Sequence, residues 1–126
     1  MNGTNRFLLD TNAIVALLRG EASIINLLQT PDWIGISVIS YLEFLSFPEL
    51  TKEDQSLFAQ FSKRVEIVGI EFHQSRMIQM AIDLRKQTRL KLPDAIIAST
   101  ALCENATLVT ADRDFSTIDN LTILSF

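Results

Sequence analysis

The sequence predicts an α/β protein with three layers, in which helices cover both faces of a mostly parallel sheet of about five strands. Two observations indicate this fold. Short apolar runs alternate along the chain with longer stretches of helical periodicity. The first run, Phe7–Leu9, is apolar at every position, as expected of a strand buried on both faces of a parallel sheet. A chain of 126 residues has single-domain size, so we expect one domain over residues 1–126.

The predicted strands are short runs of large apolar or β-branched residues bounded by polar or turn-forming residues. They are Arg6–Leu9, Trp33–Ser37, Val65–Ile70, Thr107–Thr110 and Leu121–Leu124. Helix-like stretches separate the first four, as parallel strands require. Residues Met1–Asn5, ahead of the first strand, are expected to form a loose end.

The predicted helices have apolar residues three or four positions apart, which gives each helix an apolar stripe. They are Asn12–Leu18, Glu21–Gln29, Val38–Phe47, Thr51–Lys63, Phe72–Thr88 and Asp94–Glu104. Pro31 and Pro48 end the second and third. Thr51 and Asp54 resemble a capping box at the start of the fourth, and Pro93 suits the start of the last.

Composition limits the functional class. The formal net charge of −4 argues against a protein that coats nucleic acid by bulk positive charge, but not against a nuclease that brings its own cations. The sequence has neither a run of about 18 apolar residues nor a signal-peptide pattern, so we expect no membrane association. The one cysteine, Cys103, cannot form an internal disulfide, which favours the cytoplasm. The hydrophobic content of 48% indicates a covered sheet or an apolar surface that binds a partner.

Acidic residues recur where the predicted elements meet. Asp10 follows the first strand directly, and ligands of parallel sheets bind outside the carboxyl ends of the strands. Asp112 follows the strand Thr107–Thr110, Asp94 begins a very apolar helix, and Glu43 lies within an apolar helix. Each has a simpler interpretation on its own: a helix cap, a turn residue, a helix-dipole partner or an exposed helix residue. Four such acids at one edge are better explained by a functional site.

Four segments carry these acids in order: Leu8–Asn12, Ser40–Phe44, Leu92–Ala98 and Thr110–Phe115. They resemble the PIN domain, and specifically the VapC toxin ribonucleases of type II toxin–antitoxin pairs, over nearly the whole chain. The resemblance implies a catalytic and metal-binding quartet of Asp10, Glu43, Asp94 and Asp112. It implies supporting roles for Thr11, Asn12, Thr110 and Asp114. It also implies RNA cleavage that leaves 5′-phosphate and 3′-hydroxyl ends, and a small antitoxin partner.

The expected metal follows from the donor atoms. At ~6 Å and an effective dielectric constant of ~20, the two carboxylates of each pair repel each other by roughly 3 kcal/mol. The cluster therefore needs cations to neutralise it. Without metal, the pKa values of its acids should be raised. The one histidine, His73, is expected on the surface, which leaves oxygen donors and favours Mg²⁺ or Mn²⁺. Such an ion can activate a water molecule to attack a phosphodiester.

Two further groups of residues suggest binding surfaces. A basic run before the Asp94 segment could contact RNA, although a solvated helix end explains it equally well: Arg85, Lys86, Arg89 and Lys91. Aromatic residues fall on two successive predicted helices: Phe44, Phe47, Phe58 and Phe61. Core packing accounts for most of these aromatics, and the remainder could bind a second copy or an antitoxin helix. We expect a homodimer that also binds an antitoxin.

Three other interpretations stay open. A phosphatase-type hydrolase would need an acid two residues after its aspartyl nucleophile, but Asn12 stands there. A signalling receiver would need a phospho-accepting Asp after a middle strand and a late Lys, but Glu71 and Ser125 follow those strands. A PIN nuclease that processes RNA without an antitoxin would share the fold. A short reading frame adjacent to the gene would indicate a toxin rather than such an RNA-processing nuclease.

Overall fold

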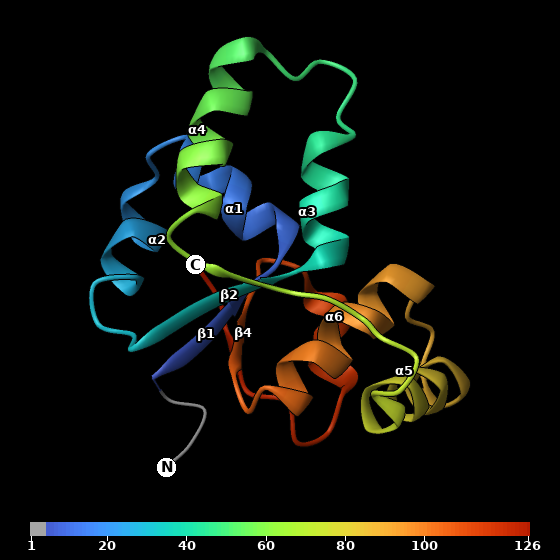
Figure 1. Ribbon diagram of the computed structural model, residues 1–126. Coiled ribbons are helices and arrows are strands. Elements are labelled where there is room, and N and C mark those ends of the chain that lie inside the picture. Colours follow the sequence, from blue (N-terminus) through green and yellow to red (C-terminus); the bar gives the residue numbers. More distant parts are fainter. Residues whose placement is uncertain (1–4) are drawn as a thin grey trace.

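Within residues 5–126, which the computed structural model describes, five parallel strands form one sheet in the order β3-β2-β1-β4-β5 (Figure 1). The strands are β1 (Arg6–Leu9), β2 (Trp33–Ser37), β3 (Glu66–Val68), β4 (Thr107–Val109) and β5 (Ile123–Leu124). Every neighbouring pair is parallel, which confirms the predicted fold class. The loose end expected at Met1–Asn5 lies outside the described residues except for Asn5.

β1 lies at the centre of the sheet and is buried on both faces. Leu8 belongs to one hydrophobic cluster, and Phe7 and Leu9 belong to a second cluster on the opposite face. Successive side chains of a strand point to opposite faces, so a central strand needs an uninterrupted apolar run. The observed bounds of β1 are those predicted from this run.

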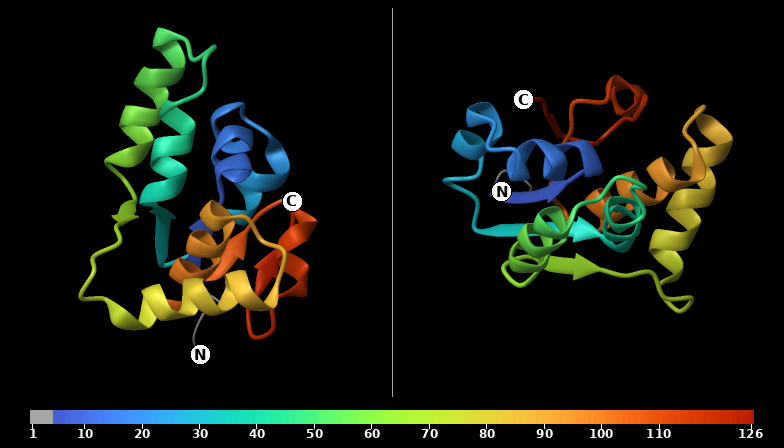
Figure 2. Two further views of the ribbon diagram at one scale, coloured as in Figure 1. Left: turned by 90° about the vertical axis from the view of Figure 1, so that its right-hand side faces the viewer. Right: turned by 90° about the horizontal axis from the view of Figure 1, so that it is seen from above.

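Helices cover both faces of the sheet (Figures 1 and 2). They are α1 (Thr11–Leu18), α2 (Ala22–Leu27), α3 (Val38–Leu45), α4 (Lys52–Ser62), α5 (Ser75–Gln87) and α6 (Leu92–Cys103). α1, α2 and α4 pack on the face that holds Phe7 and Leu9, and α5 and α6 pack on the face that holds Leu8. In the described part of the chain, none of these helices is long and apolar enough to cross a lipid bilayer.

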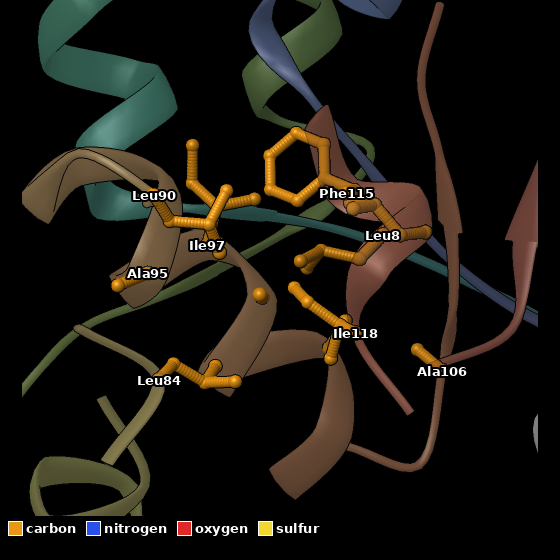
Figure 3. Packing of buried hydrophobic residues seen from close by; sticks show 11 residues of the cluster. Leu8, Leu84, Leu90, Ala95, Ile97, Ala106, Phe115 and Ile118 are labelled. Carbon is orange, nitrogen blue, oxygen red and sulfur yellow. The ribbon is translucent and has the colours of Figure 1, made fainter. Parts of the chain in front are cut away.

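The cluster under α5 and α6 contains Leu8, Ile97 and Phe115, all fully buried (Figure 3). Phe115 belongs to a short 3-10 helix, η1 (Arg113–Thr117), which the sequence analysis did not predict. Burial of Phe115 fixes the position of the chain directly after Asp112. The core therefore holds one of the predicted site segments in place.

Most element bounds differ from prediction by one or two residues, and two of the differences have identifiable reasons. β3 is paired only as far as Val68, because its partner residue Ser37 is the last of β2 and the chain then enters α3. α5 begins at Ser75 rather than Phe72. The Gln74 side chain accepts a hydrogen bond of 2.8 Å from the Glu71 N–H, and the Glu71 carbonyl accepts one of 2.9 Å from the Gln74 N–H. These bonds close a separate turn ahead of the helix.

Cap signals in the sequence are confirmed. The Thr51 hydroxyl accepts from the Asp54 N–H at 3.0 Å, and the Asp54 carboxylate accepts from the Thr51 N–H at 3.1 Å. This is the predicted capping box of α4. Pro93 lies in the first turn of α6, where its missing N–H breaks no helical hydrogen bond.

The strand order tests the receiver interpretation. Receiver domains have the flavodoxin-like order 2-1-3-4-5, in which the first strand lies between the second and third. Here β2 lies between β3 and β1, and β1 pairs with β4. The receiver interpretation is therefore wrong for this chain.

Candidate active site

Asp10 stands at the carboxyl end of β1 and is only 5% exposed. Its Oδ1 accepts a hydrogen bond of 2.8 Å from the Thr11 N–H, which caps α1. Its Oδ2 accepts from the Thr110 hydroxyl at 2.8 Å and from Nδ2 of Asn12 at 3.1 Å. The cap interpretation is therefore correct, and the same carboxylate also lies at the ligand-binding edge of the sheet.

Thr110 connects the ends of β1 and β4. Its hydroxyl donates to Asp10 and accepts hydrogen bonds from the Asp112 N–H at 3.0 Å and from Nδ2 of Asn12 at 3.3 Å. Oδ1 of Asn12 in turn accepts from the Ala111 N–H at 3.0 Å. These bonds orient the Asp10 carboxylate and hold the segment that carries Asp112.

The four predicted acids line one cleft of about 880 Å³. Glu43, on α3, accepts a hydrogen bond of 2.7 Å from the Thr11 hydroxyl. Asp94 lies in the first turn of α6, and Asp112 caps η1 by accepting from the Asp114 N–H at 2.9 Å. Carboxylates from four separate segments thus meet at one place, as the sequence analysis expected.

Two of the four acids hold protons more strongly than an ordinary carboxyl group does. The pKa of Asp94 is raised to about 6, first by burial and then by the charges of Asp10, Asp112 and Glu43. The pKa of Asp10 is raised mainly by burial, against the hydrogen bonds from Thr110 and Thr11 that lower it. The direction is as expected, but the expected cause was repulsion between like charges, and burial contributes more.

The donor atoms of the cleft can be compared with the ligands that each kind of metal ion prefers. Among residues 5–126, no three His, Cys, Asp or Glu side chains are arranged so that they could hold a metal ion on their own. Mg²⁺ usually binds proteins through one or two carboxylates, with water and substrate phosphate completing its octahedron. The donors in the cleft are carboxylate, hydroxyl and amide oxygens, which are ligands for Mg²⁺ or Mn²⁺.

The predicted basic run does not reach this cleft. Arg85 and Lys86 line an apolar groove between α5 and α6, and the Arg85 guanidinium donates to the Leu90 carbonyl at 2.9 Å. Lys91 is exposed and precedes α6. Arg89 lines a polar cleft of about 490 Å³ together with Arg113 and Asp114.

Asp114 is therefore placed beside the acidic cleft rather than in its lining. It is exposed, and its charge contributes to the raised pKa of Asp94. His73 is exposed, as predicted, and lies 3.3 Å from Glu71, outside the cleft.

Sequence reasoning missed two charged residues of the cleft, Arg19 and Glu21. Arg19 ends α1 and lines the cleft with Asn12, Val15 and Ala16, which lie on the same face of that helix. These positions recur every three or four residues, so helical periodicity counted from Asn12 was a signal that could have found Arg19.

The aromatic residues of α3 and α4 are mainly core. Phe44 and Phe58 are buried and their rings stack with centroids 4.3 Å apart. Phe47, by contrast, is 42% exposed and lines the acidic cleft. The exposed apolar side chains on and beside these helices are Leu42, Leu45, Phe47 and Leu57.

The fold and cleft together define a three-layer α/β domain with an acidic site at the carboxyl edge of a parallel sheet. The family model of the PIN domain matches residues 7–121, and the chain belongs to this family. A comparison with curated protein sequences finds no significant match.

Solved structures share the fold over nearly the whole chain. A structure of VapBC2 from Rickettsia felis bound to a promoter DNA fragment is 29% identical, covers 96% of this chain and 98% of that chain, and superposes with a TM-score of 0.78. A toxin–antitoxin complex from Klebsiella pneumoniae is 27% identical, covers 93% of this chain and 94% of that one, and has a TM-score of 0.78. DNA-bound VapBC from Salmonella typhimurium is 24% identical, covers 95% of this chain and 97% of that chain, and has a TM-score of 0.71. At this identity the likeness shows the fold alone.

Proposed function

We propose that this protein is the toxin of a type II toxin–antitoxin pair and that it cleaves RNA as a Mg²⁺- or Mn²⁺-dependent endoribonuclease. The observation that carries the proposal is the meeting of Asp10, Glu43, Asp94 and Asp112 in one cleft of a PIN domain. The fold shared with VapBC2 and with the Klebsiella pneumoniae toxin–antitoxin complex supports the toxin assignment.

The chain's own residues prepare the cleft for a cation. Thr11, Asn12 and Thr110 orient two of the carboxylates before anything binds: Thr11 holds Glu43, and all three donate to Asp10. Asp94, on a different helix, supplies a carboxyl group whose pKa is raised to about 6, mainly by burial. A bound Mg²⁺ or Mn²⁺ would supply an activated water and stabilise charge on the phosphate.

Arg19, Arg113 and one member of the predicted basic run, Arg89, would hold the RNA backbone. Arg19 lines the acidic cleft itself, and Arg89 and Arg113 line the polar cleft next to it. Asp112 and Arg113 are consecutive, so a strand whose scissile phosphate lies at the acids can place a neighbouring phosphate at Arg113. Guanidinium groups suit phosphate because they donate two parallel hydrogen bonds.

The proposal includes two protein partners and a location. A small antitoxin would place an apolar helix on the exposed side chains Leu42, Leu45, Phe47 and Leu57. Phe47 also lines the acidic cleft, so an antitoxin on this patch would lie at the entrance of the site. A second copy of the chain would complete a homodimer. We place the protein in the cytoplasm, where RNA is available and Cys103 stays reduced.

Cleavage of a labelled, structured RNA tests the nuclease. We expect cuts in single-stranded or loop regions with Mg²⁺ or Mn²⁺, none in EDTA, and none by Asp94→Asn. Asp83→Asn, on α5 away from the cleft, is the matched control and should cut like the parent. Undiminished cleavage in EDTA would refute the metal mechanism. Co-purification with the product of an adjacent reading frame distinguishes a toxin from an RNA-processing PIN nuclease.

A further inference from the structure

The acidic cleft is larger than a hydrated metal ion requires. An octahedral ion with six waters fills roughly 180 Å³, at ~30 Å³ for each water. The cleft measures about 880 Å³, and part of its lining carries no side-chain donor for a metal: Val15, Ala16, Arg19, Phe47 and Phe126. The cleft therefore has room for part of a substrate beside the ion, next to side chains that the metal chemistry does not use.

Helical spacing places the apolar part of this lining directly beyond the acids. α1 and α3 follow the carboxyl ends of β1 and β2, and they pack against each other (Figure 2). On α1, Val15 follows Thr11 by four positions, and Arg19 follows Val15 by four. At the end of α3, Phe47 follows Glu43 by four. Four positions are about one helical turn, or ~6 Å along the axis. Along the cleft, the acids are thus followed by apolar side chains and then by a guanidinium.

Phe47 is held in place by the core from one side. Its N–H donates to the Phe44 carbonyl at 3.4 Å, and the centroids of the two rings lie 5.8 Å apart. Phe44 is itself buried and stacks on Phe58. Phe47 nevertheless stays 42% exposed and lines the cleft. A ring that is already held in place loses little conformational freedom when a ligand stacks on it.

We propose that in the free protein Phe47 stacks an unpaired base of the RNA whose scissile phosphate lies at the acids, with Val15 as a second apolar contact. Of the parts of a nucleotide, only the base has apolar faces, and single-stranded RNA is bound by stacking such bases on aromatic side chains. A base inside a duplex has neighbours on both faces, so it reaches Phe47 only by leaving its stack. The inference rests on the proposed nuclease function and narrows its substrate to RNA with an unstacked base beside the cut.

Cleavage kinetics on a short RNA with one cut site test the stacking. Phe47→Ala should raise KM about tenfold with little change in kcat, and Phe47→Leu, which is apolar but has no ring, should behave similarly. Phe47→Trp should keep the KM of the parent, because an indole offers a larger face for stacking. In all three variants the slope of log KM against log salt concentration should stay that of the parent, since no phosphate contact is lost.

The matched control is Leu45→Ala. Leu45 is 40% exposed on α3, close to the exposure of Phe47, but it lies outside the lining of the cleft. Its substitution should leave KM unchanged. A Phe47→Ala or Phe47→Leu variant with the KM of the parent would overturn the proposal.

Removal of single bases from the RNA tests the same contact from the other side. We expect one position beside the cut at which an abasic nucleotide raises KM about tenfold for the parent but no further for Phe47→Ala, because both changes remove one interaction. The fluorescence of 2-aminopurine at that position should change on binding to the parent and not to Phe47→Ala. Losses that add at every position would contradict the stacking. A parent that cleaves RNA while all Phe47 variants match it refutes the stacking alone, whereas a parent that cleaves no RNA refutes the proposed nuclease function and the stacking with it.

Discussion

The hydroxyl of Thr110 donates a hydrogen bond of 2.8 Å to Oδ2 of Asp10, across 100 positions of sequence. This bond joins the carboxyl ends of β4 and β1, and it lowers the pKa of Asp10 against the effect of burial. The orientation of the most buried acid of the cleft therefore depends on a neutral side chain of another strand.

Thr110→Val should damage both activity and stability, although the side chains are similar in size. The substitution removes the donor to Asp10 and leaves the Asp112 N–H without its acceptor. We expect RNA cleavage to fall at least tenfold and the free energy of unfolding to fall by about 1–3 kcal/mol. Cleavage kinetics and urea denaturation measure the two effects. The control is Thr100→Val, a buried threonine of α6 outside the cleft, which should keep its activity. Equal activity of both variants would show that the Thr110 bond has no functional role.

Metal-free stability should fall as pH rises from about 4 to 6, and Asp94 should be a main cause. The pKa of Asp94 is about 6 in the folded chain against 3.8 ordinarily, so the folded state binds more protons in this window. Stability then decreases with increasing pH, and the decrease levels off above pH 6. Melting curves in EDTA from pH 4.5 to 7.5 should show this trend, weakened in Asp94→Asn. If the melting temperatures of the parent and of Asp94→Asn changed with pH in parallel, Asp94 would not be a main cause of the pH dependence.

Mg²⁺ should stabilise the parent through the acidic cleft. At 10 to 100 times the Kd, a ligand that binds only the folded state adds roughly 1.4 to 2.7 kcal/mol to the free energy of unfolding. We expect the melting temperature to rise in millimolar Mg²⁺ near neutral pH, and Asp94→Asn to lose most of the rise. Asp83→Asn should retain it. A rise of equal size in Asp94→Asn would place the bound cation elsewhere.

Substitution of the cleft arginines should weaken RNA binding rather than chemistry. Arg19→Gln, Arg89→Gln and Arg113→Gln should each raise KM with little change in kcat. Each should also reduce the slope of log affinity against log salt concentration by about 0.7, the value for one contact to a single-stranded phosphate. Arg64→Gln, beyond the end of α4, is the control and should leave both quantities unchanged. Unchanged salt slopes in all three variants would exclude this RNA path.

Most of the sheet and the four acids could be predicted, because each depends on a local pattern. The run Phe7–Leu9 is apolar throughout because β1 is covered on both faces, and Asp10 ends it where the strand reaches the edge. The start of α5 could not be predicted in this way. Phe72 has the apolar character of a helix position, but the side chain of Gln74 closes a separate turn.

The basic run shows a second limit of local patterns. Arg85, Lys86, Arg89 and Lys91 are close in sequence, yet they lie on different surfaces once α5 ends and the chain turns into α6. Arg19 was missed for a different reason. It belongs to none of the four acid segments, and only the helical periodicity of α1 places it on the face that lines the cleft.

The bond between Thr110 and Asp10 also has a consequence for synthesis of the chain on the ribosome. β1 is made well before β4, with which it pairs, and Asp112 comes later still. A nascent chain that ends before residue 112 has Asp10 without its main orienting partner or the fourth carboxylate. The cleft is therefore completed only after residues 110–112 have left the exit tunnel, and a shorter nascent chain lacks the proposed nuclease site.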